Sequence, residues 1–104
     1  MGMGIGTNTQ KPDEGELKGI QEEIACGIWF TSTGRTIPKI IKFMDHEGAF
    51  QIIDNIRILK MEKKYYCGIP LMEYNCSTLV GNQEYIFKLY YYMEDCKWMI
   101  EWNK

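Results

Sequence analysis

The fold of this chain is decided by residues 29–38, which read Trp29-Phe30-Thr31-Ser32-Thr33-Gly34-Arg35-Thr36-Ile37-Pro38. Apolar residues recur at every second position from 24 to 30, which is the pattern of a half-buried β-strand. Gly34 then predicts a turn, and residues 37–44 predict the next strand. Pro38 cannot donate a ladder hydrogen bond, so we expect it at the start of that strand or on an exposed edge.

The same two-residue alternation continues along the rest of the chain. Further strands are predicted over residues 50–53, 56–61, 72–80, 85–92 and 96–102, with turns at 45–48, 81–82 and 94–95. Residues 62–70 are polar and aromatic and predict a loop. Six or seven short strands predict an all-β fold, a small antiparallel meander that closes into a barrel. Closure is favoured because it removes exposed strand edges.

Length and composition restrict the class of protein. A chain of 104 residues is long enough for one domain, and a hydrophobic share of 45% is sufficient for a packed core. The net charge of −2 gives no general attraction to nucleic-acid phosphates. No apolar run is long enough to span a membrane and no signal-peptide pattern is present, so we expect a cytoplasmic protein without membrane association.

The amino-terminal part is rich in glycine and differs from the rest. Residues 1–20 are predicted to be a flexible tail before a single β-barrel domain over residues 21–104. A competing interpretation is a short helix that Asp13 caps and that buries Leu17 and Ile20.

The cysteines predict neither a metal site nor a disulfide framework. No two of them stand in a Cys-x-x-Cys pair, which zinc sites usually require, so no metal and no cofactor are expected. Cys76 and Cys96 are predicted to face the core, and Cys67 is predicted to be exposed. The four cysteines are Cys26, Cys67, Cys76 and Cys96.

His46 is the single histidine and the first candidate for acid–base catalysis. It lies in the predicted turn between Asp45 and Glu47, where water surrounds it and nothing orients it. No serine or cysteine lies in a nucleophile motif. We therefore predict no catalytic residues and a protein that is not an enzyme.

Several motifs carry a family resemblance over residues 22–102. After the stretch 29–38 come Ile41-Lys42-Phe43, Asp45-x-x-Gly48, Gly68-Ile69-Pro70, Tyr74-x-Cys76, Leu89 and Cys96-x-Trp98. Together they resemble a family of short uncharacterised proteins from anaerobic Gram-positive bacteria. The resemblance implies a small SH3-like barrel and no established activity.

Two surfaces are candidates for binding. Three consecutive tyrosines at 90–92 cannot all point inward, so an outer aromatic surface around Trp29, Arg35, Tyr90 and Tyr92 predicts a protein partner or self-association. The alternative for this surface is that a second layer, such as the tail, covers it.

The second surface combines basic and aromatic residues. Lys63, Lys64, Tyr65 and Tyr66 together could bind a single-stranded nucleic acid, because lysines contact the backbone and aromatic rings stack on bases. The acidic balance of the chain makes nucleic acid the lesser alternative, and a non-enzymatic protein-interaction domain is the function we expect.

Overall fold

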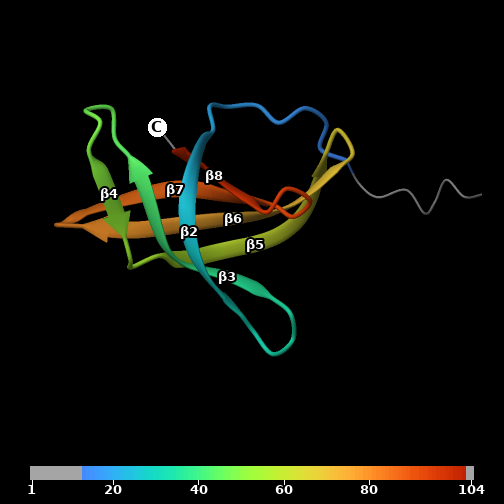
Figure 1. Cartoon of the computed structure of the whole chain (residues 1–104), viewed down its shortest axis with the longest axis horizontal. Helices are drawn as coiled ribbons and strands as arrows, with labels where there is room; N and C mark the ends of the chain where they lie inside the picture. Colours follow the sequence, from blue (N-terminus) through green and yellow to red (C-terminus); the bar gives the residue numbers. More distant parts are fainter. Residues whose placement is uncertain (1–12, 103–104) are drawn as a thin grey trace, which may run out of the picture.

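The computed structural model describes residues 13–102 and confirms the all-β prediction (Figure 1). Within this range the chain forms one antiparallel sheet of seven strands and no helix. The strands are β2 (Glu22–Phe30), β3 (Thr36–Met44), β4 (Phe50–Ile53), β5 (Arg57–Tyr66), β6 (Ile69–Val80), β7 (Gln83–Tyr92) and β8 (Lys97–Trp102).

The strands lie in the order β4-β3-β2-β8-β7-β6-β5. Strands β2, β3 and β4 pair in sequence, and so do β5, β6, β7 and β8. Glu22–Ile24 of β2 pair with Trp98–Ile100 of β8 and join these two groups into one sheet. The chain thus follows its own order around the sheet, except between β4 and β5, which form the two outer edges.

The short connection between these edges forces the sheet to curl. The edges of a flat seven-stranded sheet would be about 29 Å apart, at about 4.8 Å per strand. Residues 54–56 are all that separates β4 from β5, and the links from Ile53 to Arg57 span at most about 14 Å. The sheet is therefore a half-barrel, as Figure 1 shows.

Two side chains hold this curl. The Tyr74 hydroxyl of β6 crosses the interior and donates a hydrogen bond to the Thr36 carbonyl oxygen of β3. Asn55, in the β4–β5 connection, donates from Nδ2 to the Leu79 carbonyl oxygen at 2.9 Å and accepts from the Thr78 hydroxyl at 2.8 Å. Both contacts bring the β3–β4 side of the sheet against β6.

The concave face holds the core. Its buried side chains come from β3, β6, β7 and β8, and from β4 through Ile53. The partly buried Tyr91 packs against this core and stacks on Trp98, with ring centroids 4.8 Å apart. The core residues are Ile41, Ile53, Tyr74, Cys76, Phe87, Leu89, Trp98 and Ile100.

Two local predictions need correction, and a third is confirmed. The predicted loop over residues 62–70 is a hairpin: residues 62–66 continue β5, residues 69–70 begin β6, and only residues 67–68 form the turn. Cys96 is exposed in the β7–β8 turn, where its φ is 53°, and does not face the core. Pro38, the third residue of β3, lies beside a bulge in the β2–β3 ladder and outside the stretch that pairs with β4, so it occupies an edge position as expected, although its side chain is buried.

The described part of the predicted tail, residues 13–20, is attached to the sheet and is not helical. The Asp13 carboxylate accepts hydrogen bonds from the amides of Cys67 and Gly68 in the β5–β6 turn, at 3.1 and 2.7 Å. Gly19 has a φ of 101° and lies so close to the Glu101 carboxylate that a Cβ would be 2.7 Å from it. In Figure 1 this blue segment runs from β2 to the β5–β6 hairpin. The competing helix is wrong, and residues 1–12 lie outside the described range.

Candidate functional site

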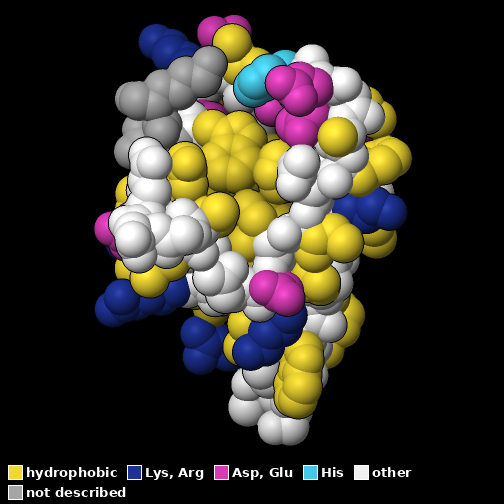
Figure 2. All heavy atoms as spheres, turned by 90° about the vertical axis from the view of Figure 1, so that its left-hand side faces the viewer, with side chains coloured by type: hydrophobic (Ala, Val, Ile, Leu, Met, Phe, Trp, Pro, Cys, Tyr) yellow, Lys and Arg dark blue, Asp and Glu magenta, His cyan; other side chains and the backbone are white. Residues whose placement is uncertain are grey.

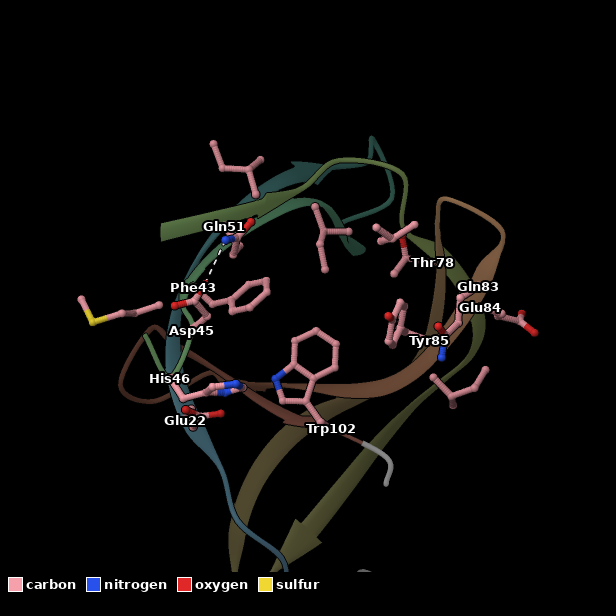
Figure 3. A pocket seen from close by; sticks show the side chains of 15 residues that line it. Glu22, Phe43, Asp45, His46, Gln51, Thr78, Gln83, Glu84, Tyr85 and Trp102 are labelled. Carbon is pink, nitrogen blue, oxygen red and sulfur yellow. Dashed lines mark hydrogen bonds between the residues drawn. The ribbon is translucent and has the colours of Figure 1, made fainter. Parts of the chain in front are cut away.

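A cleft of about 830 Å³ opens at one mouth of the half-barrel (Figure 3). The ends of β3, β6 and β8, the starts of β2 and β7, and all of β4 except Phe50 contribute to its wall. The sheet curls but does not close into a barrel, because β4 and β5 do not pair with each other. The cleft lies at the open mouth of this curled sheet. A volume in this range is typical of ligand pockets, which occur in the mouths of β-barrels.

Aromatic rings form the floor of the cleft. Trp102 lies edge-on to Phe43, with ring centroids 5.2 Å apart. The centroid of the Trp102 ring is also 5.3 Å from that of Phe87, which belongs to the core. Figure 3 shows the Trp102 and Phe43 rings projecting into the space between the two walls. The floor is thus an apolar surface that continues into the core.

The rim of the cleft exposes apolar side chains to water. Ile52 on β4 is 60% exposed and Val80 at the end of β6 is 54% exposed. Met44, Tyr85 and Ile86 are the other exposed apolar residues of the lining. Figure 2 shows this apolar hollow in its upper half, with the histidine and acidic side chains beside it. Contiguous exposed apolar surface of this kind marks binding sites.

The polar part of the rim is fixed by Asp45. Its carboxylate accepts hydrogen bonds from Gln51 Nε2 and from the amides of Glu47 and Ala49, all at 2.9 Å. These bonds, led by that from Gln51, hold the pKa of Asp45 below its ordinary value. The turn predicted at residues 45–48 is confirmed, and it places His46, which is exposed as expected, against the cleft.

The charge of the lining has one sign. Glu22, Asp45 and Glu84 are the acidic residues of the lining, of which Glu84 turns its carboxylate away from the cleft, and none of the fifteen described residues that line the cleft is Lys or Arg. The cleft therefore combines an aromatic floor, an exposed apolar rim and an acidic border. This combination suits an apolar group that carries positive charge.

The structure separates the four residues of the predicted outer aromatic surface. Trp29 and Arg35 lie at the tip of the β2–β3 hairpin, and both are exposed. Tyr90 is only 1% exposed, because Tyr66 and the Glu101 carboxylate pack against it. Tyr92 is half-buried and donates a hydrogen bond to Gln21 Oε1 at 2.9 Å. Of the segment before β2, Gln21 thus covers Tyr92, whereas Tyr90 is covered by β5 and β8 and the Trp29 end of the predicted surface stays exposed.

The predicted basic and aromatic cluster lies on β5. Lys64 and Tyr66 both turn to Glu73, which is 2% exposed, with the Lys64 Nζ at 3.0 Å and the Tyr66 hydroxyl at 2.6 Å from its carboxylate. Lys63 lies over the Tyr65 ring, 5.6 Å from its centroid. Two of the four residues are therefore engaged by a buried carboxylate.

The thiols and carboxylates of the described residues gather in no metal site. No group of three or more His, Cys, Asp or Glu side chains within residues 13–102 is arranged to hold a metal ion. Cys67 is exposed and Cys76 is buried, as predicted. Burial raises the pKa of both Cys26 and Cys76 to about 12, so these two thiols are protonated at neutral pH.

Comparisons with protein-family models, with curated proteins and with solved structures found no match. The resemblance to a family of short bacterial proteins, and its SH3-like barrel, stay predictions. Within residues 13–102, no helix of the length and apolarity needed to cross a membrane is present.

Proposed function

We propose that this protein is a non-enzymatic binding domain whose cleft takes an apolar, aromatic side chain of a protein partner. The observation that supports this most directly is the cleft itself, whose floor of Trp102 and Phe43 lies below the exposed apolar rim. Aromatic side chains are common anchors in protein interfaces, and they pack edge-to-face against rings such as these.

The polar groups of the cleft support binding better than catalysis. Both oxygens of the Asp45 carboxylate accept hydrogen bonds that shape the turn, so this group acts as a structural cap. His46 is exposed at the rim. A general base needs an orienting partner and a substrate position within hydrogen-bond reach, and Asp45 is already committed to its own turn.

Titration with indole, the ring system of a tryptophan side chain, tests this proposal. In amide and indole correlation spectra of the full chain, we expect saturable shifts at Trp102, Ile53 and Tyr85. The double variant Ile52→Lys with Val80→Lys removes apolar rim surface at two exposed positions and should abolish these shifts.

A matched control is Leu59→Lys with Ile69→Lys, which introduces the same charges at exposed apolar positions outside the cleft lining. It should bind indole as the parent chain does. Shifts that are scattered over the surface, or that persist in the Ile52 and Val80 variant, would contradict binding in the cleft.

Single-stranded nucleic acid remains the lesser alternative. Lys64 and Tyr66 bind Glu73, which leaves fewer groups of the predicted cluster to contact a phosphate backbone. No observation on the described residues favours it over the cleft. The proposed domain acts in the cytoplasm, as expected from the sequence.

A further inference from the structure

The β2–β3 hairpin ends in an exposed aromatic tip. Trp29 is 65% exposed and Phe30 is 66% exposed, although both are large apolar side chains. The tip is rigid, because Thr31 accepts a hydrogen bond from the Gly34 amide at its carbonyl oxygen and one from the Arg35 amide at its hydroxyl. Gly34 makes this turn possible with a φ of 84°. We call residues 29–39 the finger; in Figure 1 it extends away from the remaining strands.

The finger is basic, whereas the rest of the chain is acidic. Arg35, Lys39 and Lys42 are the charged residues of positions 24–44, and all fourteen Asp and Glu residues lie outside this span. Lys39 lies over the Trp29 ring, with its Nζ 5.7 Å from the centroid, so a positive charge accompanies the aromatic side chain. Figure 2 shows the finger at the bottom, with lysine and arginine side chains beside it.

The finger has the properties that the cleft selects. It offers aromatic side chains for an aromatic floor and positive charges for an acidic border made by Glu22 and Asp45. Opposite potentials on two surfaces attract them and fix their orientation. Both surfaces belong to the same chain.

The finger cannot enter the cleft of its own molecule. Strand β3 begins at the finger with Thr36 and ends at the cleft with Met44, so at about 3.3 Å per residue the two sites are about 26 Å apart. Paired strands hold that distance, because Ile37–Lys42 of β3 bond to β2. Contact between finger and cleft requires two molecules.

We infer that the occupant of the cleft is the finger of a second copy of this chain. The inference rests on the proposed function, because it names the partner of the same cleft. Trp29 or Phe30 of one copy lies on the Trp102 and Phe43 floor of the next, and Arg35 and Lys39 face its acidic border. Because finger and cleft are different surfaces, each added copy leaves one of each free, and the assembly grows head to tail.

The contact is small, so the association is weak. Trp29 and Phe30 are consecutive in β2 and point to opposite faces, so one aromatic side chain enters the cleft and buries roughly 150–250 Å². Interfaces well below about 1,200 Å² in total belong to transient complexes. Screening of the charges by salt weakens the association further.

Light scattering after size-exclusion chromatography of the full chain, at increasing concentration and at low and high salt, tests this inference. We expect a molar mass that rises with concentration and falls with salt. Trp29→Ala with Phe30→Ala should give a monomer. The exposed residues Leu59 and Ile69, replaced together by Ala, provide a control that should still associate.

A mixing experiment distinguishes finger-in-cleft contact from other modes. The finger variant Trp29→Ala with Phe30→Ala keeps its cleft, and the cleft variant Ile52→Lys with Val80→Lys keeps its finger. Each should be monomeric alone, and the mixture should form a dimer that grows no further. A mixture that stays monomeric, or a finger variant that associates like the parent chain, would overturn the inference.

Two outcomes separate this inference from the proposed function. If the chain is monomeric but indole shifts Trp102, the cleft binds aromatic groups and another partner fills it. If the parent chain is monomeric and binds phosphatidylserine vesicles through Trp29 and Phe30, the finger serves a membrane surface and the inference fails.

Discussion

At the scale of single residues, Glu73 illustrates a buried charge that its partners stabilise. Its carboxylate is 2% exposed and binds Lys64 and Tyr66, with the Lys88 Nζ at 3.9 Å. Glu73→Ala leaves the Lys64 ammonium without this partner, and breaking a buried pair from one side typically costs about 3 kcal/mol. We expect a loss of that size in the free energy of unfolding, measured with urea.

Glu62 is the matched control because its carboxylate also pairs with Lys64, at 3.7 Å, but its side chain is 38% exposed. Glu62→Ala should cost less than about 1 kcal/mol, as exposed ion pairs do. Equal losses for the two variants would show that burial does not set the strength of this pair.

The alternation of β6 predicts that Glu73 points away from Tyr74 and Cys76. Its burial depends on partners from β5 and β7, which alternation alone does not reveal.

At the scale of elements, Asn55 holds the connection on which the curl depends. Its side chain bonds to the Leu79 carbonyl oxygen and to the hydroxyl of Thr78, which is buried. Asn55→Ala leaves the Thr78 hydroxyl without this acceptor, so we expect a loss of about 1–2 kcal/mol and weaker binding of indole in the cleft. Urea unfolding and the indole titration measure the two effects. Asp54→Ala, at the exposed neighbouring position, should change neither; an equal effect there would assign the role to the connection as a whole.

Elements with local signals were predictable, and those that depend on distant partners were not. Gly34 and the Asp45 to Gly48 turn fix two hairpins through their own backbone preferences, and both predictions are confirmed. The second half of β5 was predicted as a loop because residues 62–66 are polar and aromatic without a clear apolar face. Their pairing with β6 makes them a strand.

At the scale of the whole molecule, buried titratable groups predict how stability depends on pH. Burial raises the pKa of Glu73, but the hydrogen bonds from Tyr66 and Lys64 outweigh it, and the net pKa lies below 4.5. The folded state therefore loses this stabilisation as the pH falls through that lowered value. Burial raises the pKa of Cys76 from 9.0 to about 12, so its stabilisation is complete below pH 9 and is lost as the pH rises toward 12.

Thermal unfolding midpoints from pH 3 to pH 11 should thus form a plateau that falls at both ends. Cys76→Ala should lessen the fall on the alkaline side, whereas Cys67→Ala, at an exposed thiol, should leave it unchanged. If the unfolding midpoint falls equally at alkaline pH in the parent chain and in both variants, the fall belongs to the buried tyrosines and not to Cys76.

The cleft is a property of the whole molecule, because residues far apart in the sequence meet in its lining. Its lining combines residues from six strands and one turn, so the residues next to His46 in the sequence do not reveal that His46 lies beside a cleft. Two signals were present: β4 carries apolar side chains at Phe50, Ile52 and Ile53, on both of its faces, and only three residues separate it from β5. The first predicts apolar surface on both sides of an edge strand, and the second predicts a curl.

The pairing of β2 with β8 has a consequence for the order of folding. All strand pairs except β2–β8 join strands that are consecutive in the chain. Residues 22–53 and residues 57–102 can therefore each assemble through local hairpins. The join between these two halves needs Glu22–Ile24 to meet Trp98–Ile100, almost at opposite ends of the described chain. Closing so long a loop is the slow, entropically costly step. Until synthesis reaches β8, the edge of β2 has no partner and can pair with any other unpaired strand. The nascent chain is therefore most open to misassembly just before β8 is made.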